Sequence, residues 1–287
     1  MNSEKLMNLL SQFEKLSRFG YWEDARWNKA KEDPWASLRL LLSDYAFEHQ
    51  GVSQDYSPAA VDTIDEINSS SLSEDIASVV WDSFKKKLKP KGLNEMNNSL
   101  CPKGEKYERK DGDKRTPRTT KKVSIIQFAA KRKELPIVAW AYAMMEGEKL
   151  KDAYAELQKI NGIGPKIASL FLRDLAVYFK LEPKENRRFL QPVDTWIRFV
   201  VQAISDNPKA DDGECAQFIV DNSKAPERVN QGIWYFCSDM ADSSQYVVGQ
   251  NLKDPNYFKG RVEKYIESLE RDAEIAKKAR AILEWTS

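Results

Sequence analysis

One short segment constrains the fold of this 287-residue chain more than any other: Ile160-Asn161-Gly162-Ile163-Gly164-Pro165-Lys166-Ile167-Ala168. Two glycines separated by one apolar residue permit a tight turn with positive φ angles and let another backbone approach closely. Pro165 is suited to the first turn of a helix, where a missing N–H costs little. The segment therefore predicts a tight turn that leads directly into a helix.

Apolar residues recur at helical spacing on both sides of this turn. They are Ala153, Leu157 and Ile160 before it, and Ile167, Phe171, Leu175 and Phe179 after it. The pattern predicts a helix, a hairpin and a second helix over residues 153–179. The first amides of the second helix lack partners within the helix, so they can bind an anion such as phosphate. Taken alone, a Gly-x-Gly turn is also common as a plain connection between two helices.

A second informative segment follows the hairpin: Pro192-Val193-Asp194-Thr195-Trp196-Ile197-Arg198. It places a carboxylate, Asp194, 28 residues after the amine of Lys166. An amine and a carboxylate can act as nucleophile and electrostatic stabiliser in a cleavage reaction. Each residue also has a simpler interpretation: Asp194 is suited to cap the helix that starts at Thr195, and Lys166 to contact phosphate or solvent.

Together, Gly162-Ile163-Gly164, Lys166, Ala168 and Val193-Asp194-Thr195 resemble the helix-hairpin-helix DNA glycosylase superfamily. Lys166 falls where endonuclease III and the 8-oxoguanine glycosylases carry their catalytic lysine. The run from Gly164 to Arg173 looks closest to the archaeal and bacterial 8-oxoguanine glycosylases. Two departures are the long Lys166-to-Asp194 separation, which places extra polar residues at 180–188, and Trp196 in place of a common histidine.

The resemblance implies an all-α fold with two helical subdomains and the active-site cleft between them. Residues 30–180 would form the central helical domain with the hairpin motif, and residues 1–29 plus 181–287 would form the second domain, which carries Asp194. Apolar periodicity predicts helices at 35–47, 72–88 and 123–132, another from Pro136 onward, and a long amphipathic C-terminal helix that packs back on the body.

The same resemblance implies a bifunctional chemistry. Lys166 would attack C1′ of the target nucleotide, form a Schiff base and permit β-elimination, while Asp194 would stabilise positive charge on the sugar. Attack requires an unprotonated amine, which burial and nearby cationic groups can promote. Gly162, Gly164 and Lys166 would hold DNA phosphate. The backbone carbonyls of Gln158, Ile160 and Ile163 match positions that bind a monovalent cation, Na⁺ or K⁺, in the family.

A glycosylase must hold its extruded target base in a pocket. Candidates for the base pocket are Asp44, Tyr45, His49 and Trp196, each of which also has a structural interpretation. The expected partner is double-stranded DNA with a modified base, bound by a monomer, and 8-oxoguanine is the favoured base. The alternatives are a monofunctional glycosylase for another modified base, including one in foreign DNA, and a non-catalytic DNA-binding protein.

Charge is informative only locally, because the formal net charge is +1. Basic residues gather in two runs: Lys85, Lys86, Lys87, Lys89 and Lys91, and then Lys114, Arg115, Arg118, Lys121 and Lys122. We interpret residues 85–122 as a flexible basic insertion that touches DNA phosphates. A solvated loop without a ligand is the alternative.

Cysteine and histidine are sparse. Three scattered cysteines, Cys101, Cys215 and Cys237, are too few for a four-cysteine iron–sulfur cluster, and a single histidine argues against a zinc site. No long apolar segment is found at the N-terminus, so neither a signal peptide nor a membrane span is expected. We therefore expect a cytoplasmic, nucleoid-associated enzyme without an iron–sulfur or zinc cofactor.

Overall fold

The computed structural model describes residues 3–16, 25–47, 53–68, 72–93, 98–102, 106–108, 119–132, 135–205 and 207–284. This part of the chain is mostly helical, as predicted. It divides into two compact units. The hairpin unit comprises Arg18–Asp194 and Asp211–Val220, and the terminal unit comprises Met1–Ser17, Thr195–Ala210 and Asp221–Ser287.

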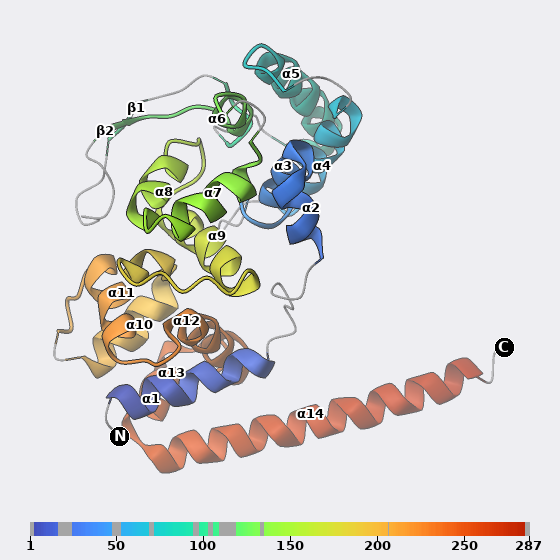
Figure 1. Ribbon diagram of the computed structural model, residues 1–287. Helices are drawn as coiled ribbons and strands as arrows, with labels where there is room; N and C mark the ends of the chain where they lie inside the picture. Colours follow the sequence, from blue (N-terminus) through green and yellow to red (C-terminus); the bar gives the residue numbers. More distant parts are fainter. Residues whose placement is uncertain are drawn as a thin grey trace. The chain divides into compact units, whose positions relative to one another are not determined.

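The hairpin unit contains most of the helices (Figure 1). In chain order these are α2 (Arg26–Glu32), α3 (Pro34–Asp44), α4 (Tyr56–Ile67), α5 (Ile76–Leu88), η3 (Lys89–Lys91), α6 (Ile125–Ala130), α7 (Ile137–Glu146), α8 (Leu150–Leu157), α9 (Pro165–Tyr178), η4 (Arg187–Leu190) and α11 (Asp212–Asp221). Strands β1 (Lys106–Glu108) and β2 (Thr119–Lys121) pair antiparallel, with Lys106 opposite Lys121. Strands this short leave no sustained alternation in the sequence, so the sequence did not predict them.

Local capping fixes where α3 and α6 begin. The Asp33 carboxylate accepts hydrogen bonds from the amides of Trp35 (2.7 Å) and Ala36 (3.2 Å), and Pro34 occupies the first position of α3. Ser124 and Gln127 form a reciprocal capping box before α6. Helices were predicted at 35–47, 72–88 and 123–132; they are found at the slightly shorter ranges of α3, α5 and α6.

The core of the hairpin unit is built around α9. Trp27 stacks on Phe171 with ring centroids 5.8 Å apart, and Tyr45 meets the same ring edge-on at 5.4 Å. Phe189 of η4 packs on Tyr154 of α8, with ring centroids 4.6 Å apart. Aromatic pairs of this kind contribute through both buried area and ring geometry. The helix that carries Lys166 is thus held on a rigid support.

The unit boundaries differ from the predicted domains. The hairpin unit also includes residues 18–29, 181–194 and 211–220. Asp194, which was expected in the other domain, is the last residue of the second of these ranges. The segment after α9 stays with this unit because Phe189 and Leu190 are buried against it. The surrounding polar residues at 180–188 concealed that anchor in the sequence.

The predicted insertion at 85–122 is more ordered than expected. Lys85 to Leu88 form the last turn of α5, Asn98 to Cys101 are buried, and so is Lys122. The prediction of a flexible segment is therefore wrong for these residues, whose apolar neighbours Phe84 and Leu100 anchor them in the core. Lys114, Arg115 and Arg118 lie outside the described residues.

The terminal unit contains both ends of the chain. Its elements are α1 (Ser3–Leu10), η1 (Ser11–Leu16), α10 (Thr195–Ile204), α12 (Pro226–Tyr235), the π-helical turn η5 (Phe236–Met240), α13 (Gln245–Lys253) and α14 (Pro255–Glu284). The N-terminal segment approaches α12 so closely that a Cβ on Gly232 would lie 1.9 Å from the Leu10 carbonyl oxygen. Only glycine fits this crossing.

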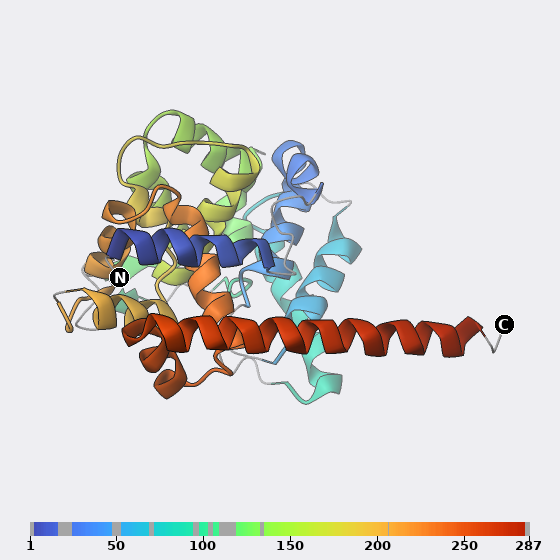
Figure 2. The same cartoon turned by 90° about the horizontal axis from the view of Figure 1, so that it is seen from below.

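The long C-terminal helix was expected to pack back on the body, and only its first part does so. Phe258 packs on Phe13 and Phe236 with ring centroids 5.9 and 5.2 Å apart, and the hydroxyls of Tyr265 and Tyr235 are 2.6 Å apart. Farther along, Ile275 is 60% exposed, and α14 extends well beyond the other helices of its unit (Figure 2). Within the described residues, no helix combines the length and apolarity needed to cross a membrane.

Candidate functional site

The hairpin between α8 and α9 has the backbone that its glycines predicted. Gly162 has φ +73°, and the amide of Ile163 donates to the Ile160 carbonyl at 3.2 Å. A Cβ on Gly162 would also lie 3.2 Å from the Ser99 hydroxyl oxygen, which is tighter than ordinary contact. Conformation and packing therefore both call for glycine at this position.

Neither conformation nor packing requires glycine at position 164. Its φ is −103°, which any residue can adopt, and a Cβ built on it meets nothing within 4 Å. It immediately precedes Pro165, so the open space lies at the N-terminus of α9. Amides in the first turn of a helix have no intrahelical acceptor and attract anions. The backbone at Gly164 is therefore not covered by a neighbouring side chain at the position where its Cβ would lie.

Two segments distant in sequence hold the hairpin in place; we call residues 98–101 and 122–125 the brace. The amide of Val123 donates to the Lys159 carbonyl, and the Asn161 amide donates to the Val123 carbonyl, both at 2.8 Å. Ser99 Oγ donates to the Asn161 carbonyl, and Asn161 Nδ2 donates to the Cys101 carbonyl, again both at 2.8 Å. The brace thereby satisfies the polar groups of Asn161, which is buried.

Lys122 of the brace reaches under the hairpin. Its Nζ donates to the carbonyls of Gln158 and Ile163, the latter at 3.1 Å, and the residue is only 9% exposed. Burial lowers the pKa of Lys122 to about 8. The sequence analysis placed this lysine in a flexible basic run. The capping box that begins at Ser124 was the available sign that ordered structure resumes next to it.

The two candidate catalytic residues lie in the same unit. Lys166 is exposed in the first turn of α9, anchored by the buried Ile167 and Ala168 that follow it. Burial, one of the two conditions expected to favour its role as a nucleophile, is therefore not met. Asp194 is half-buried, follows the buried Val193, and directly precedes α10, the position of a helix-capping residue.

Asp44 and Tyr45, two candidates for the base pocket, end α3 in contacts of their own. Asp44 is paired with Arg26, whose Nη2 lies 2.8 Å from Oδ2 of the carboxylate. Tyr45 is 2% exposed, and its hydroxyl donates to Oδ2 of Asp174 at 3.0 Å. An extruded base could stack on Tyr45 only after the core around it rearranged. Both placements match the structural interpretation of these residues.

The other two candidates for the base pocket are Trp196 and His49. Trp196 lies on α10 of the terminal unit, half-buried and edge-on to Phe199 at 6.4 Å. His49 lies outside the described residues.

The carboxylate of Asp174 belongs to a buried charged pair on α9. Arg173 donates from Nε (2.8 Å) and Nη2 (2.7 Å) to its Oδ1, and Tyr45 donates to Oδ2. Burial, followed by the charge of Asp174, raises the pKa of the Tyr45 phenol well above its usual value. The phenol therefore remains a hydrogen-bond donor throughout the ordinary pH range.

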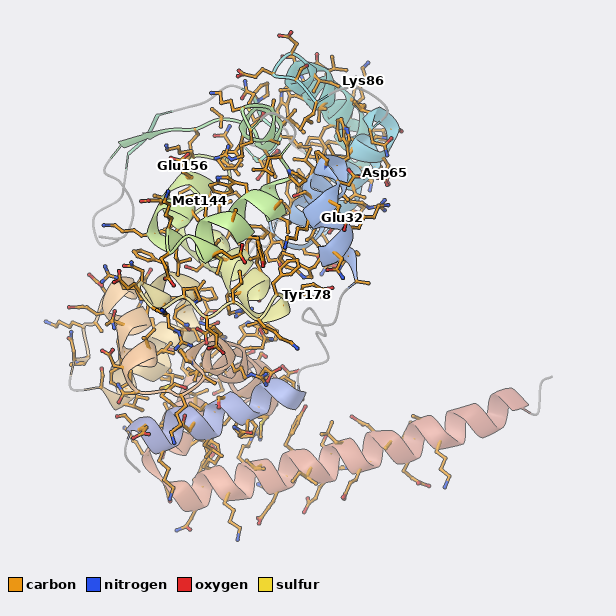
Figure 3. All side chains as sticks on the ribbon, viewed as in Figure 1. Glu32, Asp65, Lys86, Met144, Glu156 and Tyr178 are labelled. Atoms are coloured by element: carbon orange, nitrogen blue, oxygen red, sulfur yellow. The ribbon has the colours of Figure 1, made fainter. Side chains whose placement is uncertain are left out.

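The first basic run is engaged with carboxylates along α5 and η3. Lys85 pairs with Asp82 at 3.0 Å, Lys91 lies 3.6 Å from Asp55, and Lys87 pairs with Glu66. Lys86 is exposed at the outer side of α5 (Figure 3). Exposed pairs are weak and exchange readily. Lys85, Lys87 and Lys91 are therefore partly neutralised by carboxylates, whereas the exposed Lys86 forms no ion pair within the described residues.

The three cysteines, Cys101, Cys215 and Cys237, are free and buried. Among the described residues, no three His, Cys, Asp or Glu side chains are grouped as metal ligands. Comparisons of the chain with protein-family models, curated proteins and solved structures give no match. Functional inference therefore depends on the motif residues and on the geometry of the hairpin unit.

Proposed function

We propose that this chain is a base-excision DNA glycosylase that also cleaves the abasic site by β-elimination. The observation that carries the proposal is the hairpin: Gly162 in the left-handed region, open space beside Gly164, and an exposed Lys166 in the first turn of the helix that follows. A backbone of this kind can hold a DNA phosphate while a primary amine stands next to it.

In the proposed reaction Lys166 is the nucleophile. Its unprotonated amine attacks C1′, and the base leaves as the bond from C1′ to the base breaks. Opening of the C1′–O4′ bond then gives the Schiff base, and removal of a C2′ proton expels the 3′ phosphate by β-elimination. Asp194 stabilises the positive charge that develops on the sugar. The half-buried position of Asp194 supports this role, because a carboxylate with restricted motion keeps its orientation during the reaction.

The proposed substrate is duplex DNA with a modified base, and the Gly-Pro-Lys-Ile-Ala context of Lys166 favours 8-oxoguanine. A glycosylase must turn the target nucleotide out of the helix before it can cleave the bond. We propose that the chain does this as a monomer in the cytoplasm, associated with the nucleoid. Other modified bases, including those of foreign DNA, are the alternative substrates.

One observation favours a second candidate, a monofunctional glycosylase. Lys166 is exposed, and within α9 it is followed rather than surrounded by buried residues. An exposed lysine at a helix start is also suited to contact a phosphate without attacking the sugar. Such an enzyme would release the base and leave the abasic site intact.

Borohydride trapping tests these readings. The full chain would be incubated with duplexes carrying 8-oxoguanine, thymine glycol, uracil or an abasic site, in parallel with Lys166→Gln, Asp194→Asn and the control Lys159→Gln. Lys159 suits the control because it lies on the same hairpin but pairs with Glu156 of α8.

A trapped complex that is lost in Lys166→Gln and kept in Lys159→Gln supports the bifunctional enzyme. Base release without trapping assigns the monofunctional reaction. DNA binding without base release from any duplex overturns the proposal in favour of a non-catalytic binding protein.

A further inference from the structure

A single ammonium lies where two carbonyls of the hairpin converge. Gln158 ends α8 and Ile163 lies beyond the turn, yet both backbone oxygens accept hydrogen bonds from Lys122 Nζ. These are two of the three carbonyls that the family resemblance implied as ligands of Na⁺ or K⁺. An alkali ion at the same point would stand beside a second positive charge, and the charges would repel each other.

The backbone of the brace fixes the origin of this side chain. Val123, the next residue, forms two backbone hydrogen bonds with the hairpin. Its amide donates to the Lys159 carbonyl, and its carbonyl accepts from the Asn161 amide. The Lys122 main chain is therefore held against the hairpin independently of its ammonium. A buried ammonium needs hydrogen-bond acceptors around it, and the hairpin carbonyls supply them.

We propose that Lys122 provides the hairpin with a covalently attached cation in place of an alkali ion. Its ammonium draws the carbonyls of Gln158 and Ile163 toward one point and so holds the turn that presents the amides near Gly164. Lys122 is thus a positioning residue for phosphate binding. That last step rests on the proposed function, whereas the ordering of the hairpin does not.

The test uses the free protein first. Hydrogen exchange of the full chain would be compared in KCl, NaCl and tetramethylammonium chloride at equal ionic strength, for the wild type, Lys122→Met and the control Lys159→Met. Tetramethylammonium is too large to replace an alkali ion among carbonyls. It also has no N–H group with which to donate a hydrogen bond to them, as the lysine ammonium does. The exchange of residues 158–164 is the readout.

We expect wild-type hairpin exchange to be the same in all three salts. In Lys122→Met we expect it to be about tenfold faster, because hydrogen bonds from a charged donor are lost, while Lys159→Met stays close to the wild type. Faster wild-type exchange in tetramethylammonium would show that an alkali ion orders the hairpin and would overturn the proposal. Unchanged exchange in Lys122→Met would overturn it as well.

DNA binding is measured separately, by fluorescence anisotropy on a duplex with an abasic-site analogue. Weaker binding by Lys122→Met, in every salt, extends the ordering role to phosphate. If the wild type fails to bind DNA, the proposed function fails, and the exchange result still decides whether Lys122 orders the hairpin. If the wild type binds and Lys122→Met binds equally well, the positioning role is overturned.

Discussion

The hydroxyl of Ser99 donates a 2.8 Å hydrogen bond to the carbonyl of Asn161, a residue 62 positions later in the chain. The oxygen of Ser99 is also the atom closest to the place where a Gly162 side chain would begin. One serine thus sets both a hydrogen bond and a steric limit for the hairpin. Substitution of Ser99 and substitution of the hairpin glycines should therefore have effects that can be measured separately.

Ser99→Ala should destabilise the protein by about 1–3 kcal/mol, because the buried Asn161 carbonyl loses a donor. A matched control is Ser169→Ala on α9, since Ser169 Oγ is, within the described residues, buried without a hydrogen-bond partner. That substitution should cause no comparable loss. Urea unfolding of both variants measures the difference. Equal losses would show that the Ser99 bond contributes nothing specific.

The two hairpin glycines should respond differently to alanine. Gly162→Ala should lower the free energy of unfolding by about 1–2 kcal/mol from its left-handed φ alone. Gly164→Ala, at φ −103° with open space around the new methyl group, should leave stability unchanged and weaken DNA binding. Thermal unfolding and anisotropy titrations check the two readouts. Full DNA affinity in Gly164→Ala would argue that no phosphate approaches there.

Tyr45→Phe should affect the fold rather than the choice of base. The variant keeps the aromatic ring but removes the donor to Asp174, so we expect a loss of about 1–3 kcal/mol in stability. Relative rates of release among the modified bases should stay as in the wild type. A changed preference without a loss of stability would instead place Tyr45 in the base pocket.

As pH rises, deprotonation of Lys122 should change the free energy of unfolding and the DNA affinity in opposite directions. The folded pKa is lowered from 10.5 to about 8, so between these values the unfolded chain binds the proton and the folded chain does not. Stability relative to Lys122→Met should therefore rise from pH 8 to pH 10.5. DNA affinity should fall over the interval around pH 8, because the hairpin loses its ammonium. Unfolding and anisotropy series in both proteins test the two slopes, and parallel slopes would contradict the assignment of this titration to Lys122.

Local sequence patterns predicted the hairpin well, because its determinants are local. Gly162 and Pro165 fix the backbone through their own conformational preferences, and the flanking apolar residues show helical spacing. Asp33 and Ser124 likewise mark helix starts with groups that act within one turn.

The contacts that join distant segments could not be predicted in the same way. No short-range pattern connects Ser99 with Asn161, or Lys122 with Gln158, because these pairs meet only after the chain has folded. In the sequence, a lysine within a basic run looks the same whether its side chain faces solvent or backbone carbonyls in the folded protein. Likewise, the burial of Tyr45 follows from its contacts with Phe171 and Asp174 on another helix.

The brace limits how far the hairpin can be treated as a transferable module. A fragment that starts after residue 125 would keep α8, α9 and both glycines, yet it would lack the partners of Asn161, Gln158 and Ile163. Grafting residues 150–178 onto another scaffold would transplant the motif without its support. In evolution, too, residues 98–101 and 122–125 should change together with the hairpin rather than with the segment between them.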